Sequence, residues 1–279
     1  MCYNEAKTGN RDRRTRRGGR RQRELLEPIG VDWRFYGMDG KKIEALQHII
    51  SESEYIVFFG GAGVSTESGI PDFRSVDGLY HLSYRYPPET ILSRAFFQRS
   101  TEEFYRFYRE KMIYREALPN MAHRRLAELE QSGRLRAVIT QNIDGLHQAA
   151  GSRQVLELHG SVHRNHCVNC RACYDLDFIL RSEGVPRCPV CGGVVKPDVV
   201  LYGEPLDEKV LRASADHLRR ADAVIVGGTS LNVYPAAGLL DAYRGDRLVL
   251  INRDATHMDA DAALVLQENI GEVFGRLHV

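Results

Sequence analysis

Short apolar runs alternate with amphipathic segments along most of the 279-residue chain. Apolar residues recur at helical spacing at Ile43, Leu46, Ile49 and Ile50, which predicts an amphipathic helix over residues 41–52. Strand-length apolar runs follow at residues 55–59, 137–140, 155–158, 223–226 and 248–251. Helical patterns lie between several of them, near residues 120–131, 206–220 and 234–243. Because strands that alternate with helices favour parallel pairing, we predict an α/β fold with a doubly wound parallel sheet.

This alternation is interrupted at residues 71–118 and 160–200. We interpret both stretches as inserts that build a smaller second domain, within one folded unit that spans residues 38–279. Hydrophobic residues make up 43% of the chain and charged residues 27%, which is typical of a globular protein. No apolar run reaches the length of about 18 residues that a membrane span needs. The N-terminus lacks the apolar core of a signal peptide, so we expect a cytoplasmic protein.

The charge is unevenly distributed. Residues 1–37 hold ten Lys/Arg and five Asp/Glu, a formal charge of +5, while the other 28 basic and 32 acidic residues leave the body at −4. This polar, Arg-rich composition predicts a disordered basic tail. Contact with nucleic acid is one alternative for the tail. Another is translation from an upstream start codon, because Met38 opens a plausible domain of its own.

Five of the six cysteines fall within 25 residues. Two Cys-x-x-Cys pairs separated by 17 residues can place four thiolates tetrahedrally around one Zn²⁺. Because sulfur fills all four positions and leaves none open for water, the zinc is expected to be structural. We interpret Cys173 as a bystander in the same loop. The predicted ligands are Cys167, Cys170, Cys188 and Cys191.

A glycine-rich turn at residues 60–65 follows the first predicted strand directly. Glycines there let the backbone approach a pyrophosphate, and a following helix would supply amide donors at its N-terminus. A tight turn without a ligand is the structural alternative. The Gly-x-Gly-x-x-Gly spacing is absent, and no acidic residue closes a second strand about 20 residues later. A dehydrogenase that transfers hydride is therefore not supported.

Seven motifs occur in one characteristic order. They are GAGVSTESGIPDFRS at 61–75, TQNIDGLH at 140–147, LHGS at 158–161, the paired cysteines, VVLYGE at 199–204, GGTSLNVYPAA at 227–237 and IN at 251–252. In this order they resemble the sirtuin family, and the chain looks most like its compact bacterial branch over residues 38–279. One departure is Gly60, where many family members have threonine.

The resemblance implies a Rossmann-type large domain and a small domain of zinc ribbon plus helices, with NAD and an acetyl-lysine peptide meeting between them. It implies an NAD-dependent protein deacetylase. The acetyl oxygen attacks the ribose carbon that carries nicotinamide, nicotinamide leaves, and a base activates the ribose 2′-hydroxyl to attack the resulting alkylamidate. Water then releases the lysine and O-acetyl-ADP-ribose. A protein ADP-ribosyltransferase is the alternative, and a zinc-ribbon nucleic-acid-binding protein is a distant one.

The resemblance also implies roles for individual residues. It makes His159 the general base, since an imidazole titrates near neutral pH, and it places Asn142 and Asp144 around nicotinamide and its ribose. The expected NAD-binding residues are Gly61, Ala62, Gly63, Ser65, Asp72, Phe73, Arg74, Gln141, Asn142, Ile143, Asp144, Gly228, Thr229, Ser230, Asn252 and Ile270. Residues expected to bind acetyl-lysine peptides, through strand addition, are Val200, Tyr202, Gly203, Glu204, Asn232, Val233 and Tyr234. Ordinary turns or core packing are the alternatives. We expect acetylated proteins as partners, no nucleic acid, no membrane, and a monomer.

The helical stretch 102–112 bears on the choice of acyl group. Family members that prefer succinyl or malonyl lysine resemble one another in a Tyr-x-x-Arg pair on such a helix. This chain keeps Tyr105 but has Tyr108 where arginine would stand. Arg106 and Arg109 lie one position off, which is a rotation of about 100° on a helix. We therefore predict a preference for neutral acyl groups.

Overall fold

Six parallel strands form the main sheet, in the order β3-β2-β1-β7-β8-β9. The computed structural model describes residues 38–72 and 85–278, so the predicted basic tail, Phe73 and Arg74 lie outside the described residues. Every residue of the two central strands is buried, which is why they are uninterrupted apolar runs in the sequence. The predicted parallel α/β sheet is confirmed. The strands are β1 (Ile56–Gly60), β2 (Leu135–Thr140), β3 (Val155–Glu157), β7 (Ala223–Gly227), β8 (Leu248–Ile251) and β9 (Leu264–Leu266).

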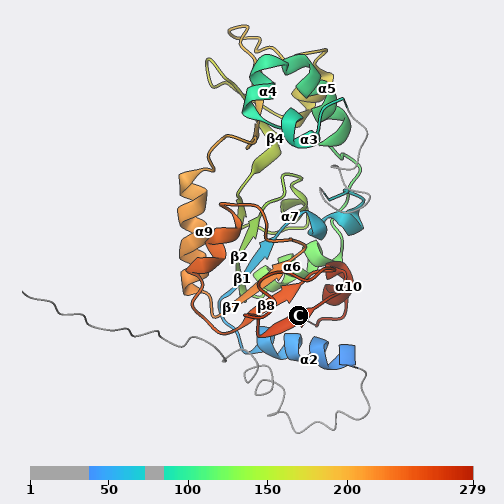
Figure 1. Cartoon of the computed structure of the whole chain (residues 1–279), viewed down its shortest axis with the longest axis vertical. Coiled ribbons are helices and arrows are strands. Elements are labelled where there is room, and N and C mark those ends of the chain that lie inside the picture. The colour runs from blue at the N-terminus through green and yellow to red at the C-terminus, as the bar shows by residue number, and fades with distance from the viewer. Residues whose placement is uncertain (1–37, 73–84, 279) are drawn as a thin grey trace, which may run out of the picture.

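Side chains of β1 alternate between two cores, one on each face of the sheet. Ile56 and Phe58 pack on the face that α2 (Met38–Ser51), α6 (Met121–Gln131) and α10 (Ile270–Gly275) cover. Val57 and Phe59 pack on the other face, which α9 (Glu208–Arg220) and the 3-10 helix η5 (Ala237–Ala242) cover. Figure 1 shows α9 on one flank of the sheet and α10 on the other. The period of two along the strand thus builds both cores at once.

The strand order reverses between β1 and β7. From β1 the chain moves outward through β2 to β3, and later returns to β7 on the opposite side of β1 before moving outward again. In an open parallel sheet, ligands bind at the carboxyl ends of the strands beside such a reversal. Gly60 ends β1 and Gly227 ends β7, and the two residues pair with one another. The topology therefore directs attention to the loops that follow these glycines.

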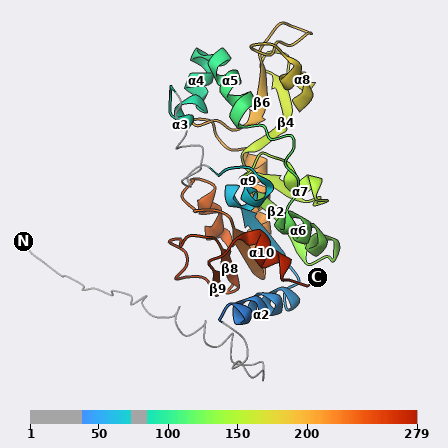
Figure 2. The same cartoon turned by 90° about the vertical axis from the view of Figure 1, so that its right-hand side faces the viewer.

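A second cluster of buried side chains lies apart from the main sheet. The helices and strands that carry it occupy the upper part of Figures 1 and 2. It is packed between helices and a three-stranded antiparallel sheet of order β5-β4-β6. The division into domains at residues 71–118 and 160–200 stays a prediction. The elements around this second core are α3 (Pro88–Ile91), α4 (Arg94–Arg99), α5 (Thr101–Lys111), β4 (Gly160–Cys167), β5 (Cys173–Tyr174), α8 (Leu176–Arg181) and β6 (Val195–Val199).

Most predicted elements form within three residues of their expected bounds, but residues 234–243 do not form the predicted α-helix. They contain the six-residue 3-10 helix η5 instead. Pro235 offers no backbone N–H, and Gly238 is a poor helix former, so a longer α-helix is disfavoured there. The sequence patterns also missed β9 and α10, which are too short to display a period. Among the described residues, none of the helices combines the length and apolar character needed to cross a membrane.

Candidate active site

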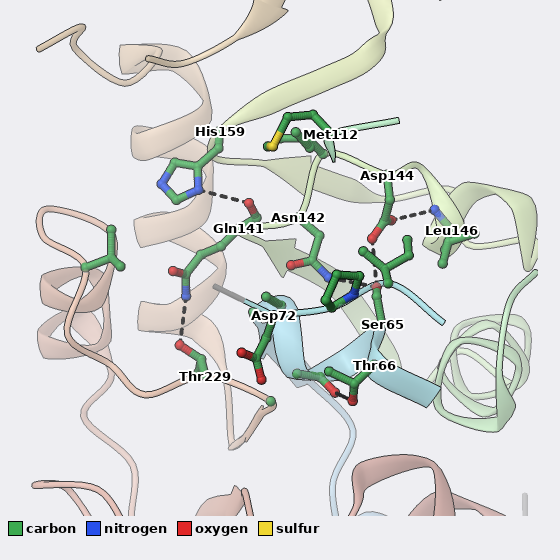
Figure 3. Close-up of a pocket in the computed structure, with 18 of the residues that line it drawn as sticks. Ser65, Thr66, Asp72, Met112, Gln141, Asn142, Asp144, Leu146, His159 and Thr229 are labelled. Carbon is green, nitrogen blue, oxygen red and sulfur yellow. Dashed lines mark hydrogen bonds between the residues drawn. The ribbon is translucent and has the colours of Figure 1, made fainter. Parts of the chain in front are cut away.

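A cavity of about 660 Å³ lies where the carboxyl ends of the main-sheet strands face the second core. Its walls come from the loops after β1, β2, β7 and β8, from the segment after β6, and from the stretch that follows α5. This is the place that the strand-order reversal indicates. Figure 3 shows His159 and Asp144 on opposite sides of Asn142, with Met112 above Asn142 and between the two in this view.

The glycines at the floor of the cavity allow two loops to touch backbone to backbone. The Gly63 N–H donates to the Gly228 carbonyl at 2.8 Å. A Cβ added to Gly63 would lie 2.8 Å from the Gly228 Cα, so only glycine fits. Gly228 has a φ of +60°, and a Cβ there would lie 2.3 Å from the Val64 nitrogen. These two glycines are thus needed for contact between the loops, independently of any phosphate.

The glycine-rich turn and the segment after it do not form an α-helix. They form two short 3-10 helices, η2 (Ala62–Val64) and η3 (Thr66–Ser68), and Gly69 ends the second in the left-handed region. The Asn120 side chain donates to the Val64 carbonyl at 2.7 Å and to the Ser68 hydroxyl at 3.0 Å, and so holds these turns from α6. The helix that was expected after the turn is therefore of the 3-10 kind in this segment, and the supply of amide donors to a pyrophosphate stays a prediction.

Ser65, Asn142 and Asp144 form a polar triangle on the wall of the cavity. The Ser65 hydroxyl donates to Asp144 Oδ2 at 2.7 Å and accepts from Asn142 Nδ2 at 3.0 Å. The Leu146 N–H donates to Asp144 Oδ1 at 2.9 Å. Burial raises the pKa of Asp144, while the hydrogen bonds from Leu146 and Ser65 act in the opposite direction. The triangle joins residues that lie 77 and 79 positions apart in the sequence.

His159 has the tautomer that a general base requires. Its Nδ1 lies 2.9 Å from the Gln141 carbonyl oxygen, which can only accept, so Nδ1 carries the proton. The lone pair is therefore on Nε2. Burial lowers the pKa of His159, and the hydrogen bond to Gln141 opposes that shift. The ring is consequently neutral near neutral pH and able to take up a proton.

The opposite end of the cavity offers donors and acceptors that fit a nucleotide. Gln141 Nε2 donates to Thr229 Oγ1 at 3.1 Å, and the Thr229 N–H donates to Asn252 Oδ1 at 2.8 Å. Asn252 Nδ2 is buried and has no hydrogen-bond partner within the described part of the chain. A buried donor without a partner is costly, and a ribose hydroxyl would supply the missing acceptor. Asp72 is paired with Arg253 at 3.1 Å across the same region.

The structure brings almost all of the described candidates together. Every described residue that we expected to bind NAD lines the cavity, as does His159. Of the residues expected to bind peptide, only Asn232 is outside the lining. The backbone of Tyr202 is already paired with the second core, since its N–H donates to Leu92 and its carbonyl accepts from Arg94, both at 2.9 Å. A peptide strand could not pair with the Tyr202 backbone while these two bonds are in place.

Sequence reasoning missed several residues of the cavity. Met112 and His163 line it, and no motif or period in the sequence marks either residue. The role of Asn120, which holds the turns beside the cavity without lining it, was also missed. An Asn before an amphipathic helix is a cap signal, and its side chain does accept from the Ala122 N–H at 3.0 Å. That signal indicates a helix start and gives no hint of the contact with Val64.

The four predicted zinc ligands gather in one cluster. Their Sγ atoms all lie within 4.8 Å of one another, with Cys167 and Cys191 at 3.4 Å and Cys170 and Cys188 at 3.6 Å. Zn–S bonds of about 2.3 Å imply S–S edges of about 3.8 Å in a tetrahedron. The cluster therefore fits a structural zinc ion. Cys173 is exposed, lies outside the cluster, and has its Sγ 3.7 Å from the Arg171 carbonyl oxygen.

The tyrosines of α5 do not reach the cavity. Tyr105 and Tyr108 are fully buried in the second core, and the Tyr105 hydroxyl donates to the Val195 carbonyl. Arg109 donates to the Ile179 carbonyl at 3.1 Å and to the Gly184 carbonyl at 2.7 Å, while Arg106 pairs with Glu103. The sequence alignment placed residues 105 and 108 at the acyl group, but neither residue lines the cavity. Two cations that do line it follow in the chain, Lys111 and Arg115.

The Sir2 family model matches residues 61–235, which is more than half of the chain. The chain therefore belongs to the Sir2 family. It is 58% identical over 239 residues to the NAD-dependent protein deacetylase of Clostridium perfringens (strain 13 / Type A), which covers 85% of this chain and 98% of that protein. A solved structure of Sir2 with a p53 peptide and NAD+ is 41% identical, with a TM-score of 0.75 over 84% of this chain and 96% of that chain. Another, with deacetylated p53 peptide and 3′-O-acetyl-ADP-ribose, has a TM-score of 0.78 at 41% identity and covers 84% and 96%.

Proposed function

We propose that this protein is an NAD-dependent protein deacetylase that transfers the acetyl group of acetyl-lysine to ADP-ribose. The products are nicotinamide, deacylated lysine and O-acetyl-ADP-ribose. The observation that carries the proposal is the state of His159, a neutral imidazole whose proton is held on Nδ1 by the Gln141 carbonyl. Its Nε2 can accept the proton of a ribose hydroxyl in the cavity. The names of the close relatives support the same activity.

The polar triangle is proposed to hold the nicotinamide end of NAD. Asn142 and Asp144 offer an amide and a carboxylate to the carboxamide and the ribose, and Ser65 keeps both side chains in place. Groups that are already positioned do not have to be ordered during the reaction, which lowers the entropic cost of catalysis. Gly228, Thr229, Ser230, Asn252 and Ile270 are proposed to line the adenosine and phosphate end.

Peptide binding is proposed along two segments of the cavity lining. Val200–Glu204 and Val233–Tyr234 both line the cavity, and Tyr202 and Tyr234 are both exposed. Glu204 steadies the first segment, because its carboxylate accepts from the Leu201 N–H at 2.9 Å and pairs with Lys196 at 3.0 Å. We also propose that the protein acts as a monomer in the cytoplasm on acetylated proteins.

Mass spectrometry of an acetylated peptide tests the activity directly. Incubation with both the protein and NAD should remove the acetyl group and release nicotinamide, while omission of either should leave the peptide unchanged. Transfer of ADP-ribose to a protein without loss of acetyl groups would instead support the ADP-ribosyltransferase alternative. An acetylated peptide that stays intact when NAD is present would contradict the proposal.

A further inference from the structure

Strand β4 connects the proposed base with the zinc cluster. It begins at Gly160, directly after His159, and ends at the ligand Cys167. Along this path it does not pair evenly with β6. Ser161 pairs with Asp198 and Asn165 pairs with Pro197, so that three residues of β4 bulge out of the ladder. A bulge of this kind re-aims side chains and backbone groups, and bulges are common beside active sites.

The bulge turns towards the loop that carries Asn142 and Asp144. The Val162 N–H donates to the Ile143 carbonyl at 3.0 Å. His163 Nε2 lies 2.9 Å from the Asp144 carbonyl oxygen, which can only accept, so Nε2–H is the donor. Residues of β4 that lack a partner in their own sheet are therefore bonded to the backbone of the nicotinamide-side loop.

The contact with His163 also shapes Gly145, the last residue of this loop. Gly145 has a φ of +76°, and a Cβ added there would lie 2.7 Å from His163 Cδ2 and 2.8 Å from Nε2. The imidazole thus lies directly over the Gly145 Cα. A glycine is needed both for the left-handed conformation and for the closeness of the ring. The ring and the glycine fit together as a pair.

We propose that His163 is a positioning residue that clamps the Asn142–Gly145 loop from the side of the second core. Ser65 holds the side chains of this loop from the nucleotide side, and His163 holds its backbone from the opposite side. The zinc cluster fixes the far end of β4, so the clamp makes the position of the loop depend on the zinc-bearing sheet. This inference rests on the proposed function only for its kinetic consequence.

Two substitutions of similar size separate the hydrogen bond from simple packing. His163→Leu keeps an apolar body over Gly145 but has no donor, whereas His163→Gln carries an N–H donor at a comparable reach. Because the His163 side chain is exposed, both variants are expected to fold and to keep their zinc. His48→Leu, on α2 at the far side of the main sheet, is the control for loss of a histidine elsewhere.

The rate of amide hydrogen exchange in residues 142–146 reports how firmly the loop is held, and it can be measured without any enzymatic activity. The exchange should be faster in His163→Leu and near that of the wild type in His163→Gln and His48→Leu. In steady-state assays His163→Leu should raise the KM for NAD by about fivefold, in line with the loss of one hydrogen bond, and leave the KM for peptide within about twofold. Equal exchange of this segment in the wild type and both His163 variants would overturn the inference. An inactive wild-type protein would overturn the proposed function and leave the exchange comparison valid.

Discussion

Individual side chains in the cavity are set by partners that lie far away in the sequence. Gln141 illustrates this, because its carbonyl fixes the His159 tautomer while its side chain donates to Thr229. One residue thus links the proposed base to the proposed adenosine end. Substitutions at this scale should change the chemistry while leaving the shape of the cavity intact.

His159→Ala is expected to bind NAD normally but to lose turnover by at least about a hundredfold, because proton acceptance in the transition state is missing while the walls remain. NAD binding can be measured by calorimetry and turnover on an acetylated peptide. His48→Ala serves as the control. Near-normal deacetylation by His159→Ala would show that another group is the base.

The pH dependence of the reaction should reveal the burial of His159. Since burial lowers its pKa from 6.5, the neutral base persists to lower pH than an ordinary histidine would allow. The profile of kcat/KM should therefore fall on the acid side with an apparent pKa below 6.5, and His159→Ala should lack this limb. An acid limb centred above 6.5 would contradict the assignment.

At the scale of elements, β4 and α5 have different roles in the second core: β4 reaches the cavity, and α5 mainly packs the core. β4 carries a zinc ligand at one end and leads to His159 at the other, so the metal stabilises an element that also shapes the cavity. The helix α5 contributes buried aromatic rings to the same core, and Phe104 stacks on Tyr108 with 5.5 Å between ring centroids. These contacts are structural, which explains why Tyr105 and Tyr108 do not line the cavity.

Loss of zinc is expected to unfold the small antiparallel sheet and to abolish activity, because the binding energy of a structural zinc is part of the folding energy. Metal analysis should find one zinc per chain. Cys170→Ser should lose zinc and activity together. Cys173→Ser is the matched control, since this thiol lies outside the cluster, and it should retain both. Active protein without zinc would contradict this prediction.

Acetyl-lysine is expected to be a better substrate than succinyl-lysine by at least about tenfold, equivalent to about 1.4 kcal/mol. A buried carboxylate without a cation is costly, and no arginine of α5 reaches the cavity. Lys111 and Arg115 line it, but they pair with Glu110 at 2.8 Å and with Asp177 at 3.2 Å. Values of kcat/KM on one peptide with either acyl group test this. A preference for succinyl would implicate these two cations, and Arg115→Gln should then remove it.

For the whole molecule, stability depends on pH through a pair of buried histidines in the main core. His123 of α6 and His147 of α7 (Leu146–Ala149) are almost fully buried, with ring centroids 4.7 Å apart. Burial lowers the pKa of His123 to about 4, and it lowers the pKa of His147 well below its ordinary value. Neither His147 nitrogen has a hydrogen-bond partner among the described residues. The folded protein therefore disfavours the charged form of both rings.

Acid should destabilise the protein through these two rings. Unfolded histidines take up protons as the pH falls below about 6.5, whereas the folded rings resist, so stability declines from about pH 6.5 towards the folded pKa of each ring. Each ring contributes at most about 1.4 kcal/mol per pH unit over that window. Denaturant unfolding between pH 7 and 4.5 measures the slope. His147→Phe, which cannot titrate and packs beside Phe58, should flatten the slope; an unchanged slope would exclude this origin.

Local pattern was enough to predict most strands of the main sheet and most of the helices that cover it. Buried strands such as β1 and β7 are continuous apolar runs because helices cover both faces, and α2, α6 and α9 show the helical period of one buried stripe. The zinc cluster was also predictable. Each Cys-x-x-Cys pair supplies two ligands, so the four ligands are complete once the two pairs lie beside one another. The order of motifs was sufficient to indicate the family, and nearly every described residue that it selected for NAD or peptide binding lines the cavity.

Only the tertiary structure decided which of these residues meet. Hydrogen bonds between Gly63 and Gly228, around Ser65, and between the β4 bulge and the Asn142–Gly145 loop join residues that are 19 to 165 positions apart. A sequence period reports which face of an element is buried, but closeness between elements depends on strand order and register. For the same reason the stretch 102–112 could be predicted as a helix, while the direction in which Tyr105 and Tyr108 point was settled by packing against the second core.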